Sequence, residues 1–127
     1  IIKMDLNKDQ IVYLNKSYIE SILLNLMSNS LRYCDPIRQL KISISSKKVG
    51  NETIITFKDN GIGIDLERNK DKVFGLYQRF HDYPDSKGLG LYLVKSQVES
   101  MGGTISIDST VGVGTTFTII FKNNKDV

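Results

Sequence analysis

Alternation of apolar and polar residues predicts six strands in this chain. The alternation is cleanest around Ile42 and Ile44, which share one face of their strand. Gly50-Asn51 and the later pair Gly112 and Gly114 supply the turns of two antiparallel hairpins. The predicted strands are residues 1–6, 11–14, 41–46, 53–58, 104–109 and 115–122.

Two other segments repeat their apolar residues with helical spacing. The first runs from about residue 18 to residue 33, and Asn15 or Ser17 is placed to cap it. The second ends at Gly102-Gly103. Together these elements predict an α+β fold, a two-layer sandwich whose mixed, largely antiparallel sheet is covered by helices on one face. The predicted buried sides consist of Ile19, Ile22, Leu23, Leu24, Leu26, Met27 and Leu31 in the first helix and Leu91, Val94, Val98 and Met101 in the second.

Composition places the chain among ordinary globular proteins. Its 127 residues fit one domain over residues 1–127, and 40% hydrophobic with 24% charged residues is typical of a folded soluble protein. The net charge of +3 comes from scattered Lys and Arg, so we expect no nucleic-acid partner. The single cysteine, Cys34, favours a reducing compartment, and no apolar stretch reaches the roughly 18 residues of a membrane span. We expect a cytoplasmic domain cut from a longer protein that is either membrane-anchored or soluble; if it is anchored, the anchor would lie outside these residues.

Polar residues occupy one face of the first predicted helix. At about 100° per residue, Asn25, Asn29 and Arg32 are stacked neighbours there, beside Ser21 and Ser28. A solvated stripe is the plain alternative, but such stripes are usually Lys, Glu and Gln. Asparagine is a poor helix former, and its short amide suits ligating a cation or orienting a phosphate. Asn25, Asn29 and Arg32 are therefore candidate site residues.

Three glycine motifs add to this face, and each also has a purely structural explanation. Asp59-Asn60-Gly61-Ile62-Gly63-Ile64 follows a strand; it is either a turn or a place where a flat ligand meets the backbone beside a carboxylate. Gly88-Leu89-Gly90-Leu91 opens the second helix, where free N–H groups form a natural phosphate cradle unless the glycines serve packing alone. It is neither a dinucleotide fingerprint nor a P-loop. Gly112-Val113-Gly114-Thr115-Thr116-Phe117 also fits a plain hairpin turn.

In this order the segments resemble the catalytic and ATP-binding domain of sensor histidine kinases, in the superfamily that also holds gyrase, the large heat-shock ATPase and the mismatch-repair ATPases. The resemblance covers essentially the whole chain, and five motifs in series are far more specific than any one alone. It implies the superfamily's ATP-binding fold, the Bergerat fold. The matching motifs are the N box at residues 22–33, the G1 box at 59–63, the F box at 74–80, the G2 box at 88–91 and the last glycine motif at 112–117.

The resemblance also implies roles for individual residues. Asn29 would ligate the Mg²⁺ that bridges the ATP phosphates, while Arg32 would meet the phosphates and, with Arg79, stabilise the transferring phosphoryl group. Asp59 would accept a hydrogen bond from the adenine amino group. The other residues expected around ATP are Gly61, Gly63 and Ile64 at the base, Thr115 or Thr116 on the adenine side, and Gly88, Leu89, Gly90 and Leu91 over the phosphates.

Residues 65–87 would be a mobile lid over the ATP. This charged, aromatic-rich stretch is longer than an ordinary connection, and long irregular loops are usually functional. We expect it to order when ATP binds, with Phe74 and Tyr77 as partial exceptions that are pinned to the core or to the phosphoacceptor domain. Where the family usually has another glycine, this chain has Ser86 followed by Lys87. A stiffer lid hinge is expected, with Lys87 replacing lost backbone contacts to phosphate.

The acceptor of the phosphoryl group is missing from this chain. Phosphoryl transfer asks the protein mainly for positioning and charge neutralisation, and the only histidine, His81, lies outside any segment like the phosphoacceptor helix. The resemblance thus implies an ATP-dependent protein-histidine kinase. Its partners would be a phosphoacceptor histidine domain of the same or sister chain in a homodimer, and a downstream response regulator. The isolated domain should be a monomer.

Two alternatives remain open. One is a serine kinase or hydrolytic ATPase on the same fold, although a Glu commonly stands in those proteins where this chain has Asn25. The other is a nucleotide-binding module without catalysis, against which Asn29, Arg32, Asp59 and the complete glycine motifs argue.

Overall fold

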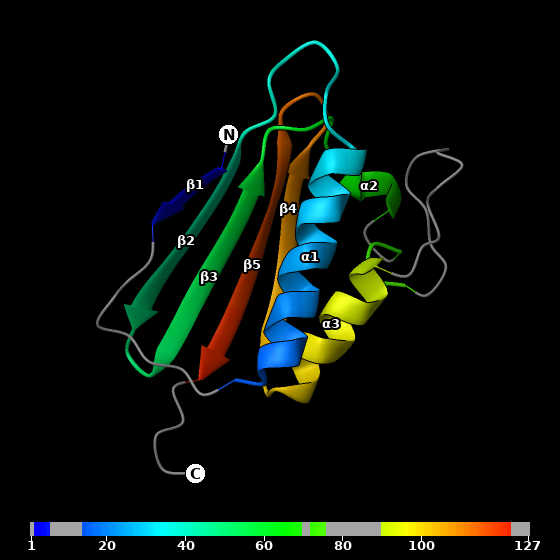
Figure 1. Cartoon of the computed structure of the whole chain (residues 1–127). Coiled ribbons are helices and arrows are strands. Elements are labelled where there is room, and N and C mark those ends of the chain that lie inside the picture. The colour runs from blue at the N-terminus through cyan, green and yellow to red at the C-terminus, as the bar shows by residue number, and fades with distance from the viewer. Residues whose placement is uncertain (1, 6–13, 70–71, 76–89, 123–127) are drawn as a thin grey trace.

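The chain folds into a sheet layer and a helix layer (Figure 1). The computed structural model describes residues 2–5, 14–69, 72–75 and 90–122, and every element named below belongs to this part of the chain. The strands are β1 (Ile2–Asp5), β2 (Ile42–Val49), β3 (Glu52–Asp59), β4 (Thr104–Thr110) and β5 (Gly114–Lys122), and the helices are α1 (Lys16–Arg32), α2 (Leu66–Asn69) and α3 (Gly90–Ser100).

The strand order in the sheet is β1-β2-β3-β5-β4. β1 runs parallel to β2, whereas β2 with β3, β3 with β5 and β4 with β5 are antiparallel pairs. α1 and α3 lie side by side against one face of this sheet (Figure 1). The predicted α+β sandwich, with a mixed and largely antiparallel sheet covered on one face, is therefore confirmed.

Both predicted hairpins form, and both are longer than the alternation indicated. Val49 pairs with Glu52 across the two-residue turn Gly50-Asn51, and the φ of 60° at Gly50 explains the glycine there. Thr110 pairs with Gly114 in the second hairpin. Of the strand predicted at 11–14, residues 11–13 lie outside the described residues, and Leu14 belongs to no strand.

α1 begins and ends close to the predicted positions, but the predicted buried arc is too broad. The Asn15 side chain accepts a hydrogen bond from the Tyr18 N–H at 3.2 Å, so Asn15 rather than Ser17 is the cap. Ile22 is 1% exposed, whereas Leu24 and Leu31 are 65% and 61% exposed, which corrects their placement in the core. At about 100° per residue both leucines lie almost opposite Ile22, and one sheet cannot cover both sides of a helix. None of the described helices is long and apolar enough to cross a membrane.

Residues 65–69 and 72–75, which begin the predicted lid, are anchored to the rest of the fold. Residues 66–69 form α2, and Val73 is 1% exposed within the core. The Phe74 ring packs edge-on against Phe117 at 6.3 Å, and the Lys95 ammonium lies 5.6 Å from the Phe74 ring centre. Phe74 is thus pinned as expected, but the fold already holds the first part of the predicted lid. Tyr77 lies outside the described residues.

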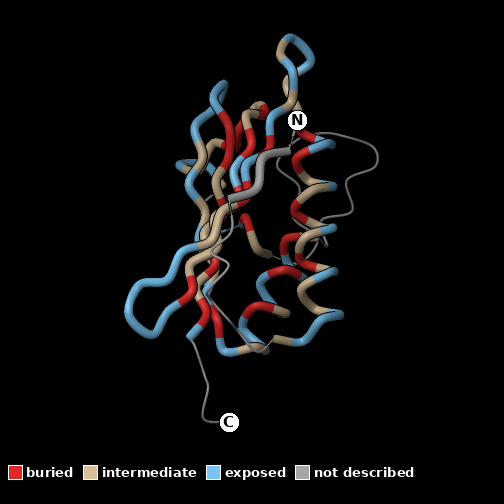
Figure 2. Tube along the Cα trace, turned by 60° about the vertical axis from the view of Figure 1, so that its left-hand side comes forward, coloured by how far each residue is buried: buried red, intermediate tan, exposed pale blue. Residues whose placement is uncertain are grey.

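The core lies between the sheet and the helices, where Figure 2 shows the buried positions gathered. Three aromatic rings from the central strands form its middle, and aliphatic residues of α1 and α3 cover them. Its buried members are Ile22, Leu26, Ile42, Ile44, Phe57, Val73, Leu91, Val94, Val98, Phe117, Ile119 and Phe121.

Candidate functional site

Asp59, the last residue of β3, carries a buried carboxylate that the fold almost fully satisfies. Its Oδ1 accepts hydrogen bonds from the Gly61 N–H at 2.9 Å and the Thr115 N–H at 3.3 Å, and its Oδ2 accepts from the Ser30 hydroxyl at 2.8 Å. A carboxylate offers about four acceptor positions, so roughly one remains, on Oδ2. The buried group can therefore receive a single further N–H without losing its internal bonds.

Glycines let the backbone close tightly around this carboxylate. A Cβ on Gly61 would lie 2.5 Å from the Tyr33 carbonyl oxygen. At Gly63 and Gly114, where φ is 77° and 147°, a Cβ would collide with carbonyl oxygens of β4 and β3. We call residues 59–64 and 110–115 the glycine end. Close approach requires the glycine at Gly61, and close approach together with backbone conformation requires it at Gly63 and Gly114.

Hydrogen bonds connect the glycine end to its surroundings. The Ile62 N–H donates to the Tyr33 carbonyl at 3.0 Å, and the Ile62 carbonyl accepts from the Gly112 N–H at 2.8 Å. The Ile64 N–H donates to the Ser109 hydroxyl oxygen at 2.8 Å. The segment after β3 is thus held on one side by the end of α1 and on the other by the β4–β5 hairpin.

Strand register separates the two candidate threonines. Thr115 pairs with Asp59, is 5% exposed, and its hydroxyl lies 2.8 Å from that of Ser109. Thr116 pairs with Lys58, and neighbouring residues of a strand point to opposite faces of the sheet. Only Thr115 therefore lies on the Asp59 side, which corrects the inclusion of Thr116 in the site.

Asn25, Asn29 and Arg32 of α1 form the second part of the candidate site, which we call the asparagine face. The Asn25 side-chain NH₂ donates to the Ser21 carbonyl at 2.8 Å, and its Oδ1 would lie 3.3 Å from a Cβ on Gly90. Asn29 is half-buried and makes no side-chain hydrogen bond with another described residue. Arg32 is exposed in the last turn of α1. Among the described residues, the Asn29 and Arg32 side chains thus form no hydrogen bond or ion pair.

Gly90 brings the start of α3 against this face. Because Gly90 has no Cβ, the first free N–H groups of α3 can lie close to Asn25. Leu91 is 7% exposed and packs in the core at the start of α3. The remaining predicted residues, Arg79, Lys87, Gly88 and Leu89, lie outside the described residues.

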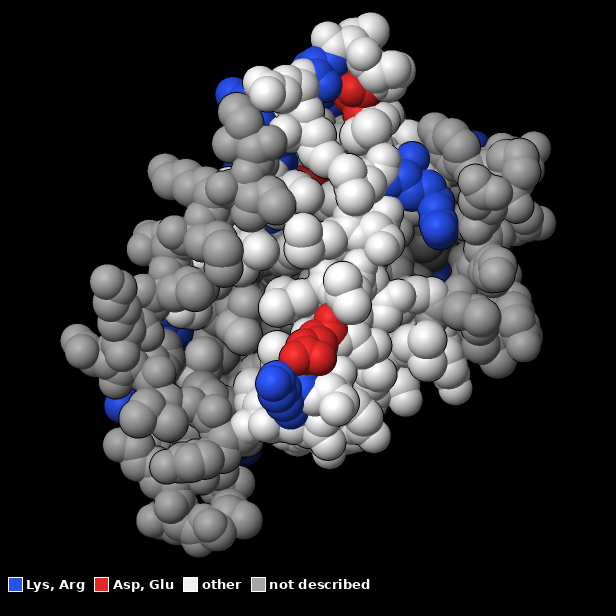
Figure 3. Space-filling model, viewed as in Figure 1, with Lys and Arg blue, Asp and Glu red and all other residues white. Residues whose placement is uncertain are grey.

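The described residues show no concentration of positive charge on the face seen in Figure 3 and no ready-made metal site. On the face seen in Figure 3, Lys and Arg are scattered among uncharged residues. The described part of the chain holds no group of three or more His, Cys, Asp or Glu that could bind a metal ion.

Known proteins that resemble this chain identify its family. Residues 15–125 match the family described as "Histidine kinase-, DNA gyrase B-, and HSP90-like ATPase". The chain belongs to this family. The sensor histidine kinase GraS of Staphylococcus epidermidis is 34% identical over 128 residues, which cover 98% of this chain and 36% of GraS. WalK of Bacillus subtilis, another sensor histidine kinase, is 32% identical over 126 residues, covering 94% of this chain and 20% of WalK.

Solved structures agree with this assignment. The histidine kinase AdeS of Acinetobacter baumannii, at 28% identity, superposes with a TM-score of 0.76 over 98% of this chain and 55% of that one. The nucleotide-free catalytic domain of histidine kinase ThkA has a TM-score of 0.78 over 96% and 80% of the two chains; at 22% identity it supports the fold alone. The chain thus matches the catalytic domain of sensor histidine kinases in sequence and fold, and it spans about a third of its GraS relative.

Sequence reasoning missed two residues of this histidine kinase catalytic domain. Ser30 lies within the apolar arc of α1, between Leu23 and Leu26 in angle, and a lone hydroxyl there is a signal for a buried polar partner. Arg38, in the loop between α1 and β2, donates hydrogen bonds to four backbone carbonyls. No sequence pattern distinguishes Arg38 from a solvated loop arginine.

Proposed function

We propose that this domain binds Mg²⁺-ATP between the glycine end and the asparagine face and transfers its γ-phosphoryl group to a histidine on a separate domain. The observation that supports this most is the hydrogen bond between Ser30 and Asp59. Ser30 follows Asn29 directly in α1, so this 2.8 Å bond links the two halves of the proposed site. A base at Asp59 and a phosphate chain running toward Asn29 would then contact one contiguous surface.

The glycine end fits an adenine ring. The remaining acceptor position of Asp59 matches the single amino group of adenine, which is a hydrogen-bond donor. Gly61 and Gly63 support this pocket by letting the backbone pack closely around Asp59, because a Cβ on either would collide with a carbonyl oxygen. Thr115 and Ile64 complete this side with a hydroxyl and a buried apolar side chain.

The asparagine face fits a metal-bound triphosphate. Mg²⁺ is usually held by one or two protein oxygens together with phosphate and water, and the half-buried Asn29 amide offers one such oxygen. Bound there, Mg²⁺ would neutralise phosphate charge. Arg32 and the first N–H groups of α3 beyond Gly90 would hold phosphate oxygens on either side. Arg79, Lys87, Gly88 and Leu89 are proposed for the same region from the resemblance alone.

In this proposal the domain positions ATP for phosphoryl transfer but does not supply the attacking nucleophile. Asn25 stands where hydrolytic relatives commonly have Glu, and an amide cannot act as a general base toward water. Its NH₂ group is moreover engaged by Ser21. The attacking atom would be a ring nitrogen of a histidine on the phosphoacceptor domain of a full-length homodimer, and the phosphoryl group would then pass to a response regulator.

Incubation with γ-labelled ATP tests the proposal. The domain alone should bind ATP, release phosphate very slowly and remain unlabelled, because Asn25 offers no base for water and the described residues contain no histidine. When a fragment carrying the phosphoacceptor helix is added, acid-labile label should appear on that fragment. Rapid phosphate release by the domain alone would favour the ATPase, acid-stable labelling of serine would favour the serine kinase, and binding without transfer would favour the non-catalytic module.

A further inference from the structure

Arg38 joins the two segments of the glycine end through their carbonyl groups. Its Nε donates to the Asn60 carbonyl at 2.7 Å, and its Nη2 donates to the Gly61 carbonyl at 2.7 Å. Its Nη1 donates to the Gly112 carbonyl at 2.8 Å, and Nη2 also reaches the Val113 carbonyl at 3.4 Å. One side chain thus bridges the turn after β3 and the β4–β5 turn.

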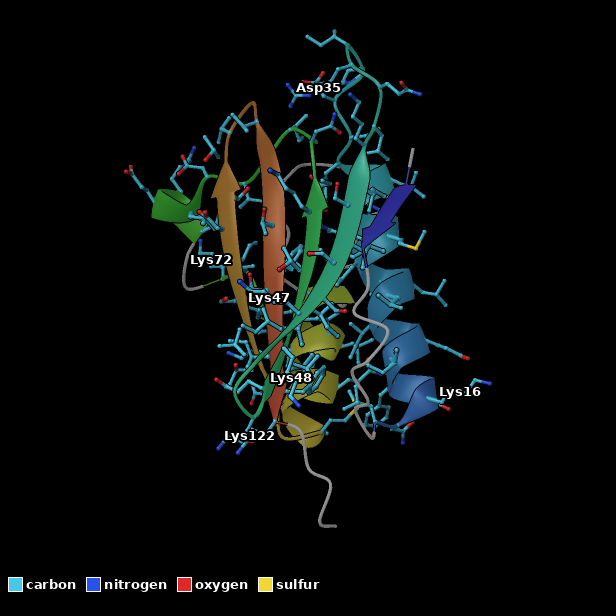
Figure 4. All side chains as sticks on the ribbon, turned by 90° about the vertical axis from the view of Figure 1, so that its left-hand side faces the viewer. Lys16, Asp35, Lys47, Lys48, Lys72 and Lys122 are labelled. Atoms are coloured by element: carbon cyan, nitrogen blue, oxygen red, sulfur yellow. The ribbon has the colours of Figure 1, made fainter. Side chains whose placement is uncertain are left out.

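The bridge depends on the shape of a guanidinium group. Four carbonyl oxygens carry like partial charges, and bringing them together is unfavourable unless one cation with several donors lies between them. Arginine offers five N–H groups in a planar fork, whereas lysine has a single ammonium that cannot span the same set. Asp35 forms an ion pair with Arg38, and its carboxylate lies 3.6 Å from Nη2. Figure 4 shows Asp35 at the end of the molecule where β3 ends.

The bridged peptides are the ones that orient Asp59. The Asn60 carbonyl belongs to the same peptide group as the Gly61 N–H, which donates to Asp59 Oδ1, and the Gly61 carbonyl belongs to the next peptide group. Every hydrogen bond of the Arg38 side chain goes to the two turns, and its ion pair with Asp35 lies within its own loop. Arg38 therefore acts on the geometry of the glycine end rather than on the core.

We infer that Arg38 is a positioning residue for base recognition. It does not contact the nucleotide; it fixes the Asn60 and Gly61 peptides so that the last acceptor position of Asp59 faces the amino group of the base. This inference rests on the proposed function and deepens it, because it names a residue outside the site that sets how strongly the base is recognised.

The test measures how much the amino group contributes to binding. Titration calorimetry with Mg²⁺ compares ATP with purine riboside triphosphate, which lacks the amino group, for the wild type, Arg38→Ala and Arg38→Lys. In the wild type the amino group should improve affinity by about tenfold or more, as expected of a hydrogen bond to a charged group. In both variants this advantage should fall to about twofold. Lys48→Ala, which removes an exposed cation at the end of β2 far from Asp59, should keep the full advantage.

A second measurement follows the ligand-free protein. Amide hydrogen exchange at Gly61 and Thr115, both of which donate to Asp59, should become about tenfold faster in Arg38→Ala and Arg38→Lys. Lower thermal stability with an undiminished amino-group advantage would overturn the inference and make Arg38 a purely structural residue. If the wild type fails to bind ATP, the proposed function fails, and unchanged exchange in Arg38→Lys would separately refute the bridge.

Discussion

The glycine end and the asparagine face are built in opposite ways. At the glycine end, backbone meets backbone, and collisions with carbonyl oxygens exclude any Cβ at Gly61, Gly63 and Gly114. On the asparagine face, three polar side chains project from one side of a single helix, half-buried or exposed, and only Asn25 has a partner among the described residues. Glycines that lack side chains shape the glycine end, whereas polar side chains form the asparagine face.

This contrast separates the requirements of folding from those of binding. A substitution at Gly61, Gly63 or Gly114 must move neighbouring backbone, so it acts on the free energy of unfolding as well as on ligand affinity. A substitution on the asparagine face removes a group that the folded protein hardly uses, so its effect should appear mainly with ligand. The variants below test this division.

The largest effect is expected for Gly114→Ala. The added Cβ would collide with the Asp59 carbonyl oxygen, and the φ of 147° is strained for alanine, so the free energy of unfolding should fall by about 3 kcal/mol or more. Chemical denaturation measures this. Gly112→Ala is the matched control, because Gly112 also has a positive φ, 82°, but open space around it, and it should lose about 1 kcal/mol. Equal losses in both variants would show that close approach does not define the glycine end.

A smaller effect is expected for Asp59→Ala. The variant loses the proposed hydrogen bond from the base, so ATP affinity should fall by roughly ten- to a hundred-fold, or about 1.5–3 kcal/mol. Calorimetric titration with Mg²⁺-ATP checks this. Asp108→Ala removes an exposed carboxylate from β4 and should leave affinity unchanged. Unchanged affinity in Asp59→Ala would remove Asp59 from the base site.

The smallest effect is expected for Asn29→Ala. Stability should change by less than about 0.5 kcal/mol, because Asn29 has no side-chain hydrogen bond among the described residues. Affinity for ATP should fall by about tenfold in the presence of Mg²⁺ and hardly change in EDTA, since only the metal-dependent part is lost. Ser28→Ala, an exposed neighbour on α1, serves as the control. A large loss of stability would show that Asn29 belongs to the fold rather than to the site.

Much of the fold could be predicted because its signals are local. Alternation around Ile42 and Ile44 and the turn residues of both hairpins are direct consequences of strand geometry. The exceptions arise from tertiary packing. Leu24 and Leu31 look like core residues until the sheet is seen to cover only one side of α1, and Val73 is anchored by a core that no local pattern reveals.

The candidate site could be predicted from the sequence where its chemistry requires a recognisable sequence motif. Asp59 and its glycines are recognisable because tight turns and buried carboxylates need particular residue types. Thr115 could not be separated from Thr116 without the strand register. Arg38 could not be found at all, because its partners are backbone carbonyls, and carbonyls are the same in every residue.

The Tyr33 carbonyl fixes the length of the last turn of α1. It accepts the Ile62 N–H at 3.0 Å and faces Gly61, while the Tyr33 N–H closes the helix on the Asn29 carbonyl at 3.1 Å. Adding or deleting one residue between Asn29 and Tyr33 would turn Asn29 by about 100° and shift it by about 1.5 Å relative to the glycine end. Gly50, in the β2–β3 turn, has open space around it. Insertions and deletions should therefore accumulate at the β2–β3 turn as such domains diverge and be excluded from the stretch between Asn29 and Tyr33.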